Sequence, residues 1–125
     1  MLNLASLFIA ITALLHAFFF KLESLDFMKP RTLQRFQLTP QDASVVKIWA
    51  FNQGFYNLFL ACGLAYALDL LHGGHPVEGK VLAQFILLAI TGAGLVLGFS
   101  APQKKVAAAV QALPALIGFV LTLLL

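Results

Sequence analysis

Charged residues are scarce in this chain. Only 10% of its 125 residues are Asp, Glu, Lys or Arg, whereas 61% are hydrophobic, and the mean hydropathy is +0.92. Soluble domains carry roughly 25% charged residues, and so few polar groups cannot cover a soluble globule of this size. The composition therefore excludes an ordinary soluble domain and predicts a membrane protein with one domain at most.

Cysteine is almost absent, and the motifs of common metal and nucleotide sites are missing. Cys62 is the only cysteine, so an internal disulfide is excluded, and its apolar surroundings favour a packing side chain over a reactive thiol. His72 and His75 flank two glycines without a third ligand nearby, which favours a plain loop over a metal site. No phosphate-binding loop, nucleophile elbow or His-Glu-x-x-His motif occurs. We therefore expect no metal and no cofactor.

What the chain has instead is four long apolar runs, at about residues 2–22, 45–70, 79–99 and 106–124. About 20 helical residues cross a hydrocarbon core about 30 Å thick, and lipid requires each segment to satisfy its own backbone hydrogen bonds. The first run has no basic residue before Lys21 and no cleavage pattern, so we interpret it as a retained helix. The sequence predicts an all-α integral membrane protein with a four-transmembrane-helix bundle.

The distribution of lysine and arginine predicts the orientation of this bundle. Seven of the eight lie in or beside the first and third connections: Lys21, Lys29, Arg31, Arg35, Lys47, Lys104 and Lys105. Lys80 alone belongs to the second connection, and the tail has none. The positive-inside rule then predicts a cytoplasmic basic loop over 23–44 and two extracytoplasmic termini. This placement accounts for the net charge of +3 without a nucleic-acid partner.

Within the loop, Lys29, Arg31 and Arg35 alternate with apolar residues. Two interpretations are open at this point. The segment is either a basic amphipathic stretch lying on the inner leaflet or a short linker with ordinary topology charges. The lipid bilayer is a partner in both.

Two segments have the composition of helix starts. Thr39-Pro40-Gln41-Asp42 offers a capping threonine, a proline at the first helical position and an acid in the first turn. The second helix is therefore expected to begin near Pro40, before the chain enters the bilayer. Ser100-Ala101-Pro102-Gln103 has the spacing of a capping box and predicts a helix start there.

Polar or small residues recur at helical spacing in every run and predict one polar stripe on each helix. The predicted stripes are Thr12, His16, Phe19 and Glu23; Asn52, Gln53, Tyr56, Asn57, Leu60 and Gly63; Gln84, Leu88, Thr91, Leu95 and Gly98; and Gln111, Ala115, Gly118 and Thr122. A buried amide without a partner costs several kcal/mol, so these groups must face protein or water. From their depths, we expect one ligand-binding pocket in the inner leaflet formed by His16, Glu23, Asn52, Gln53, Tyr56, Asn57 and Gln111, with Gln84 at the opposite mouth.

Plainer roles remain open for the same residues. The amides can simply hold helices together, and His16 can be a satisfied structural histidine instead of a binding or proton-transferring group. Glu23 can pair with Lys21 or an arginine of the loop. Gly94 and Gly98 form a GxxxG pattern, which serves either packing within the chain or a homo-oligomer.

The motif from Asn52 to Asn57, with His16 and Glu23 before it and Gln111-x-x-Pro114-Ala115 after it, resembles a known family. This family comprises small four-span membrane proteins, mainly bacterial, and is catalogued as domain of unknown function 1304. The resemblance covers essentially the whole chain, although Asp26-Phe27 stands where the family tends to have an aromatic residue after the glutamate. It implies a bacterial cytoplasmic (inner) membrane location and assigns no activity to the matching residues.

Three functions follow as hypotheses. The first is binding or passage of a small polar or amphipathic molecule, a metabolite or a lipid, in the inner-leaflet pocket. The second is a membrane-embedded enzyme, an isomerase or lipid-modifying protein, with His16 and Glu23 as catalytic acid and base, although seven helical residues separate them by about 10 Å. The third is a structural or partner-binding membrane subunit.

Overall fold

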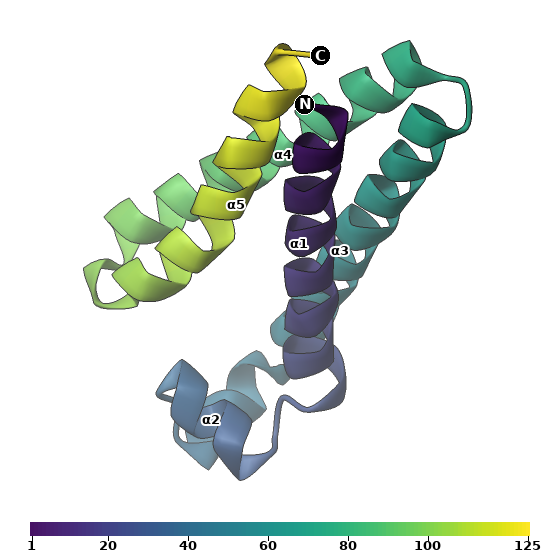
Figure 1. Cartoon of the computed structure of the whole chain (residues 1–125). Coiled ribbons are helices and arrows are strands. Elements are labelled where there is room, and N and C mark those ends of the chain that lie inside the picture. The colour runs from purple at the N-terminus through teal and green to yellow at the C-terminus, as the bar shows by residue number, and fades with distance from the viewer.

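The computed structural model covers residues 1–125 and is all helical (Figure 1). Its segments are α1 (Leu2–Phe20), the π-helical turn η1 (Lys21–Leu25), α2 (Pro30–Phe36), α3 (Pro40–His72), α4 (Pro76–Ser100), the 3-10 turn η2 (Pro102–Lys104) and α5 (Lys105–Leu123). Four helical stretches are long and apolar enough to cross a membrane, namely α1 with η1, α3, α4, and η2 with α5. The predicted all-α fold, with four helices long and apolar enough to span a membrane, is confirmed.

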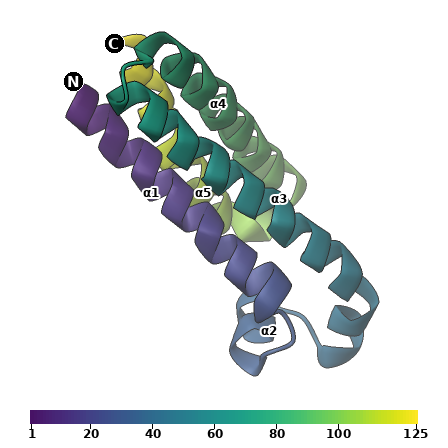
Figure 2. The ribbon, with the colours of Figure 1, turned by 90° about the vertical axis from the view of Figure 1, so that its right-hand side faces the viewer.

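The four long helices run antiparallel, and each packs against two neighbours (Figures 1 and 2). Helix α1 contacts α3 and α5, and α4 contacts the same two helices. Both chain termini and the α3–α4 turn lie at one end of the bundle, which we call the termini end (Figure 1). The opposite end, the α2 end, holds α2 and the α4–α5 turn, where Lys104 Nζ donates a hydrogen bond to Phe36 O over 2.9 Å.

The main hydrophobic core lies towards the termini end. It consists of Ile9, Leu64, Ala67, Leu71, Ala83, Ile86, Leu87, Ile90 and Ala115. A separate cluster of Phe27, Leu33 and Ala43 attaches α2 to the start of α3. The bundle is therefore packed continuously at one end, whereas the other end depends on a small satellite core.

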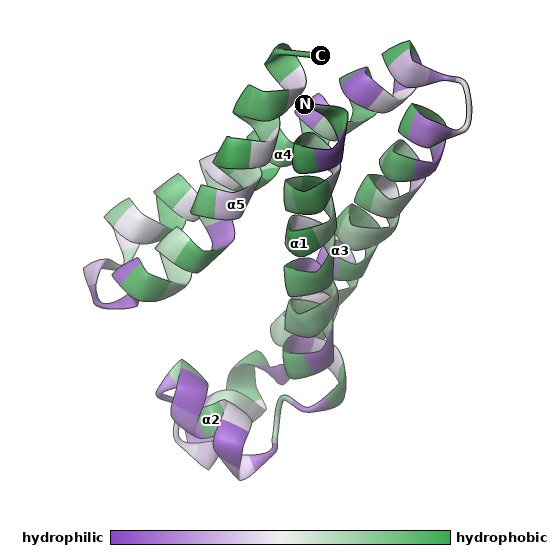
Figure 3. Cartoon of the chain, in the orientation of Figure 1, coloured by the Kyte–Doolittle hydropathy of each residue, from purple (hydrophilic) through white to green (hydrophobic).

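Large apolar side chains cover the outside of the bundle, and hydrophilic residues gather on α2 and at the helix ends (Figure 3). Leu14, Phe85 and Phe99 are 71%, 72% and 84% exposed. In water such a surface would cause aggregation, whereas it is compatible with contact with lipid chains. The surface agrees with an integral membrane protein.

One of the two predicted helix starts is confirmed. The Asp42 backbone N–H donates to Thr39 Oγ1 over 3.1 Å, and Pro40 opens α3. The capping box predicted at Ser100 is wrong, because Ser100 is the last residue of α4 and its hydroxyl donates to Val96 O over 2.7 Å. The chain reverses through η2 before α5 begins.

The predicted stripes match the buried faces unevenly. In α1, Thr12 and His16 are buried as predicted. In α4, the predicted positions Leu88 and Leu95 are 55% and 53% exposed, and only Thr91 of that stripe is buried with the core. The predicted α4 stripe is wrong because leucine is as stable against lipid as against protein. The spacing of apolar residues therefore does not show which face of a membrane helix is buried.

The glycines of the GxxxG pattern face α5 within the same chain. A methyl group at Gly94 would lie 2.7 Å from Ala112 Cβ, and one at Gly98 would lie 3.5 Å from Ala108 Cβ. Small residues on both helices thus allow the backbones of α4 and α5 to approach closely. A homo-oligomer through this pattern stays a prediction.

An even closer approach joins η1 to α3. Ser24 Oγ donates to Phe51 O over 2.8 Å, and a methyl group at Gly54 would collide with the Ser24 hydroxyl and lie 3.0 Å from the Ser24 backbone nitrogen. No side chain larger than hydrogen fits at residue 54 without moving η1. This contact fixes where the chain leaves α1.

Gly54→Ala is therefore expected to lower the free energy of unfolding by about 1–3 kcal/mol through overpacking. The matched control is Gly92→Ala in α4, where an added methyl group meets nothing within 4 Å; it should stabilise the chain by up to about 1 kcal/mol through helix propensity. Unfolding in mixed detergent micelles, followed by circular dichroism, measures both. Equal stabilisation by the two substitutions would contradict the close contact.

Candidate functional site

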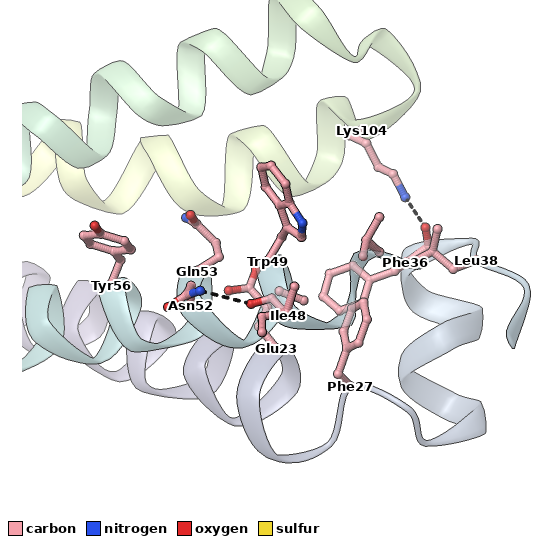
Figure 4. Close-up of a pocket in the computed structure, with 12 residues that line it drawn as sticks. Glu23, Phe27, Phe36, Leu38, Ile48, Trp49, Asn52, Gln53, Tyr56 and Lys104 are labelled. Atoms are coloured by element: carbon pink, nitrogen blue, oxygen red, sulfur yellow. Dashed lines mark hydrogen bonds between the residues drawn. The ribbon is translucent and has the colours of Figure 1, made fainter. Parts of the chain in front are cut away.

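A groove of about 750 Å³ opens at the α2 end, between α2, α3 and the α4–α5 turn (Figure 4). We call it the amide groove. Of its 12 lining residues, 8 are hydrophobic; the full lining is Glu23, Phe27, Phe36, Leu38, Val46, Ile48, Trp49, Ala50, Asn52, Gln53, Tyr56 and Lys104. Its few polar groups are thus set within apolar walls.

One face of α3 supplies the polar wall. Trp49, Asn52, Gln53 and Tyr56 follow one another at spacings that keep them on the same side of a helix, and Figure 4 shows them along the groove. The Asn52 amide donates to Ile48 O of its own helix over 3.2 Å. Gln53 and Tyr56 are exposed, Tyr56 by 66%, so their polar groups are accessible to a ligand.

Glu23 enters the groove from η1 and is held by an amide from α3. Asn57 Nδ2 donates to Glu23 Oε2 over 2.7 Å, and Asn57 is buried. The pairing of Glu23 with Lys21, which the sequence left open, does not occur, because the ammonium of Lys21 binds the carboxylate of Asp26 instead. Asn57 therefore acts between helices, and it positions the carboxylate that faces the groove.

His16 lies in the interior of the bundle and does not line the groove. Its Nδ1 lies 2.9 Å from Thr12 O, and its ring packs edge-on against Phe19 with centroids 5.4 Å apart. A carbonyl only accepts, so Nδ1 carries the proton of this hydrogen bond. Nε2 is buried without a partner, and the other such side-chain atom in the chain is Nε2 of Gln84.

Only some of the seven residues expected to form one pocket lie together. Glu23, Asn52, Gln53 and Tyr56 line one groove, with Asn57 directly behind Glu23. His16 and the half-buried Gln111 of α5 do not belong to its lining. The amides of α3 also do not share one face, since Asn57 binds Glu23 of η1 whereas Asn52 lines the groove.

Sequence reasoning missed the other walls of the groove. Phe27 precedes α2 and Phe36 is the last residue of α2, and their ring centroids are 5.9 Å apart. Lys104 closes the groove from η2 through its hydrogen bond to Phe36 O. The available signal was the presence of two phenylalanines in an otherwise basic segment. No group of three or more His, Cys, Asp or Glu side chains is placed to hold a metal ion.

The sequence profile of one protein family matches residues 10–123, and its description is protein of unknown function (DUF1304). The chain belongs to this family. The match includes every residue that lines the amide groove, and it confirms the resemblance drawn from the motif at Asn52–Asn57. No curated protein and no solved structure matches the chain.

The two neighbouring asparagines of the family motif should differ in their effect on stability. Asn57→Ala removes the amide partner of Glu23 and should lower the free energy of unfolding by about 1–3 kcal/mol. Asn52→Ala removes only a bond to its own helix, so a change within about 0.5 kcal/mol is expected. Detergent unfolding of the two variants checks this contrast. Equal losses at both positions would show that the Glu23–Asn57 bond does not hold η1 on α3.

Proposed function

We propose that the chain binds a small amphipathic molecule in the amide groove. The observation that carries this proposal is a concave surface with eight hydrophobic residues, one of which is Tyr56 with its hydroxyl, and with Glu23, Asn52 and Gln53 among them. Small-molecule sites are typically concave and apolar, with a few placed polar groups that orient the ligand. The groove has both properties and is accessible from outside the bundle.

The chemistry of the lining favours a ligand with an uncharged polar end. Carboxamide and phenol groups both donate and accept hydrogen bonds without contributing a net charge, and Gln53 and Tyr56 are accessible. The two charged groups of the lining each make one hydrogen bond within the chain, Glu23 with Asn57 and Lys104 with Phe36 O. An apolar chain would lie along Trp49 and the phenylalanines.

Binding is better supported than catalysis by a His16–Glu23 pair. A general acid or base must come within about 3 Å of the proton that it transfers. Glu23 lines the groove, whereas His16 is 1% exposed and lies outside the lining. A substrate bound in the groove would contact only one member of that pair.

We further propose that the α2 end faces the cytoplasm of a bacterial cell, with the bundle in the inner membrane. Seven of the eight lysines and arginines belong to segments at or near the α2 end, and Lys80 belongs to the opposite end. The positive-inside rule supports this orientation, and the mainly bacterial membership of the resembling family supports the location.

Cysteine labelling of intact cells tests the orientation. In a Cys62→Ala background, a membrane-impermeant maleimide should modify His75→Cys in intact cells, because His75 lies in the α3–α4 turn. The same reagent should modify Gln103→Cys, in the α4–α5 turn, only after lysis. The reverse pattern would place the termini in the cytoplasm and refute the proposed orientation.

Fluorescence of Trp49, the only tryptophan of the chain, tests the proposed binding. For full-length protein in phosphatidylcholine nanodiscs, addition of a monoacylglycerol should shift the Trp49 emission saturably. Gln53→Leu and Tyr56→Phe should each weaken this binding about threefold to tenfold, the effect of one hydrogen bond. Tyr66→Phe, on α3 outside the groove, is the matched control and should leave it unchanged.

Two comparisons make this test decisive. A fatty acid and an alkylammonium of the same chain length should bind more weakly than the monoacylglycerol, because the exposed side chains of Gln53 and Tyr56 carry no net charge. A shift that never saturates, or one that Gln53→Leu and Tyr66→Phe alter equally, would contradict a specific site in the groove.

A further inference from the structure

A second groove, of about 650 Å³, lies beside η1 and α2 and shares no residue with the amide groove. We call it the basic groove. Only two of its nine lining residues are hydrophobic, and the charged ones are Lys21, Asp26, Lys29, Arg31 and Arg35. Four cations therefore converge on one concave surface with a single carboxylate.

The carboxylate fixes two of the cations and leaves the other two free. Asp26 binds the ammonium groups of Lys21 and Lys29, the latter at 2.7 Å. These two hydrogen bonds hold the pKa of the Asp26 carboxyl below its ordinary value, so Asp26 stays ionised at neutral pH. Neither Arg31 nor Arg35 has an acidic partner among the ion pairs of the chain. The basic groove keeps an excess of positive charge.

The position of this groove relates its charge to the membrane surface. It begins at Phe18 and Lys21, in the last turns of the first membrane-spanning stretch, which ends at Leu25. The guanidinium of Arg35 lies over the Phe18 ring, 5.6 Å from its centroid, so a side chain of α2 contacts the last turn of α1. Leu25 and Met28 are exposed nearby, by 62% and 38%. Apolar contacts and cations thus meet where a lipid's chains meet its headgroup.

We propose that the basic groove binds the phosphate of an anionic phospholipid. One guanidinium group can donate two parallel hydrogen bonds to two oxygens of a phosphate. Arg31 and Arg35 are the lining cations without a carboxylate partner. Basic clusters next to a membrane-spanning helix attract anionic headgroups. The acyl chains would extend along Phe18 and Leu25 into the bilayer. Ordinary topology charges would need no common concave surface, whereas these four cations share one.

Native mass spectrometry of the full-length protein in neutral detergent tests this site. Titration with a short-chain phosphatidylglycerol should give a retained lipid, and a phosphatidylcholine of the same chain length should bind more weakly. Arg31→Gln/Arg35→Gln should weaken phosphatidylglycerol binding by about fivefold for each charge removed. Arg31→Lys/Arg35→Lys keeps both charges and should lose less. The matched control, Lys47→Gln/Lys105→Gln, removes two cations near the same end but outside the groove and should bind as the parent chain does.

Several results would overturn the proposal. Equal binding of the two lipids would show that the negative charge of the headgroup does not determine binding. Equal losses in the groove and control variants would show that the lipid is attracted by the overall positive charge and not by a specific site. Competition by inorganic phosphate at the same concentration as the lipid would identify a soluble anion as the ligand instead. Circular dichroism confirms that each variant is folded before it is titrated. The amide groove is unaltered in these variants, so the outcome is independent of the function proposed for it.

Discussion

The close contact between η1 and α3 at Gly54 determines the arrangement of the whole α2 end. Because residue 54 has no side chain, Ser24 reaches the carbonyl of Phe51 at 2.8 Å, and Asn57 reaches Glu23 one turn further along α3. These bonds satisfy polar groups that would otherwise cost several kcal/mol in a membrane. They also set the point from which the chain departs towards α2, and hence the walls of both grooves.

Different interactions hold the helices together at the two ends of the bundle. At the termini end, leucine, isoleucine and alanine of all four long helices form one core. At the α2 end, a small hydrophobic cluster and one hydrogen bond from Lys104 to a carbonyl join α2 to its neighbours. The looser packing leaves room for a largely apolar groove that contains the Asn52 and Gln53 amides of α3 and, beside it, a groove lined by cations. A single short helix thus takes part in two surfaces of different chemistry.

The sequence was sufficient to predict the four membrane-length helices, but not the short helix α2 or the rotation of every long helix. Hydropathy gave four membrane-length helices, the threonine and proline at 39 and 40 gave the start of α3, and helical spacing gave the buried face of α1. The buried face of α4 could not be predicted, because apolar side chains are equally stable against lipid and protein.

The site was predicted only in part, because the sequence does not show the direction of each side chain either. The amides of α3 were identified as polar groups that need a partner, but depth along a helix does not reveal the direction in which a side chain points. Asn57 and Asn52 therefore could not be separated, and His16 could not be excluded from the lining. The contribution of Phe36 and Lys104 depends on the fold of α2 against η2, which no local pattern specifies.

Cryo-electron microscopy of the protein in a lipid nanodisc tests the central claim most directly. The claim is that the amide groove is a site for an amphipathic molecule. We predict an open groove with elongated density along Trp49, one end of which lies within hydrogen-bonding distance of Gln53 or Tyr56. A closed α2 end, with those side chains packed dry against α5 and no density between them, would contradict it.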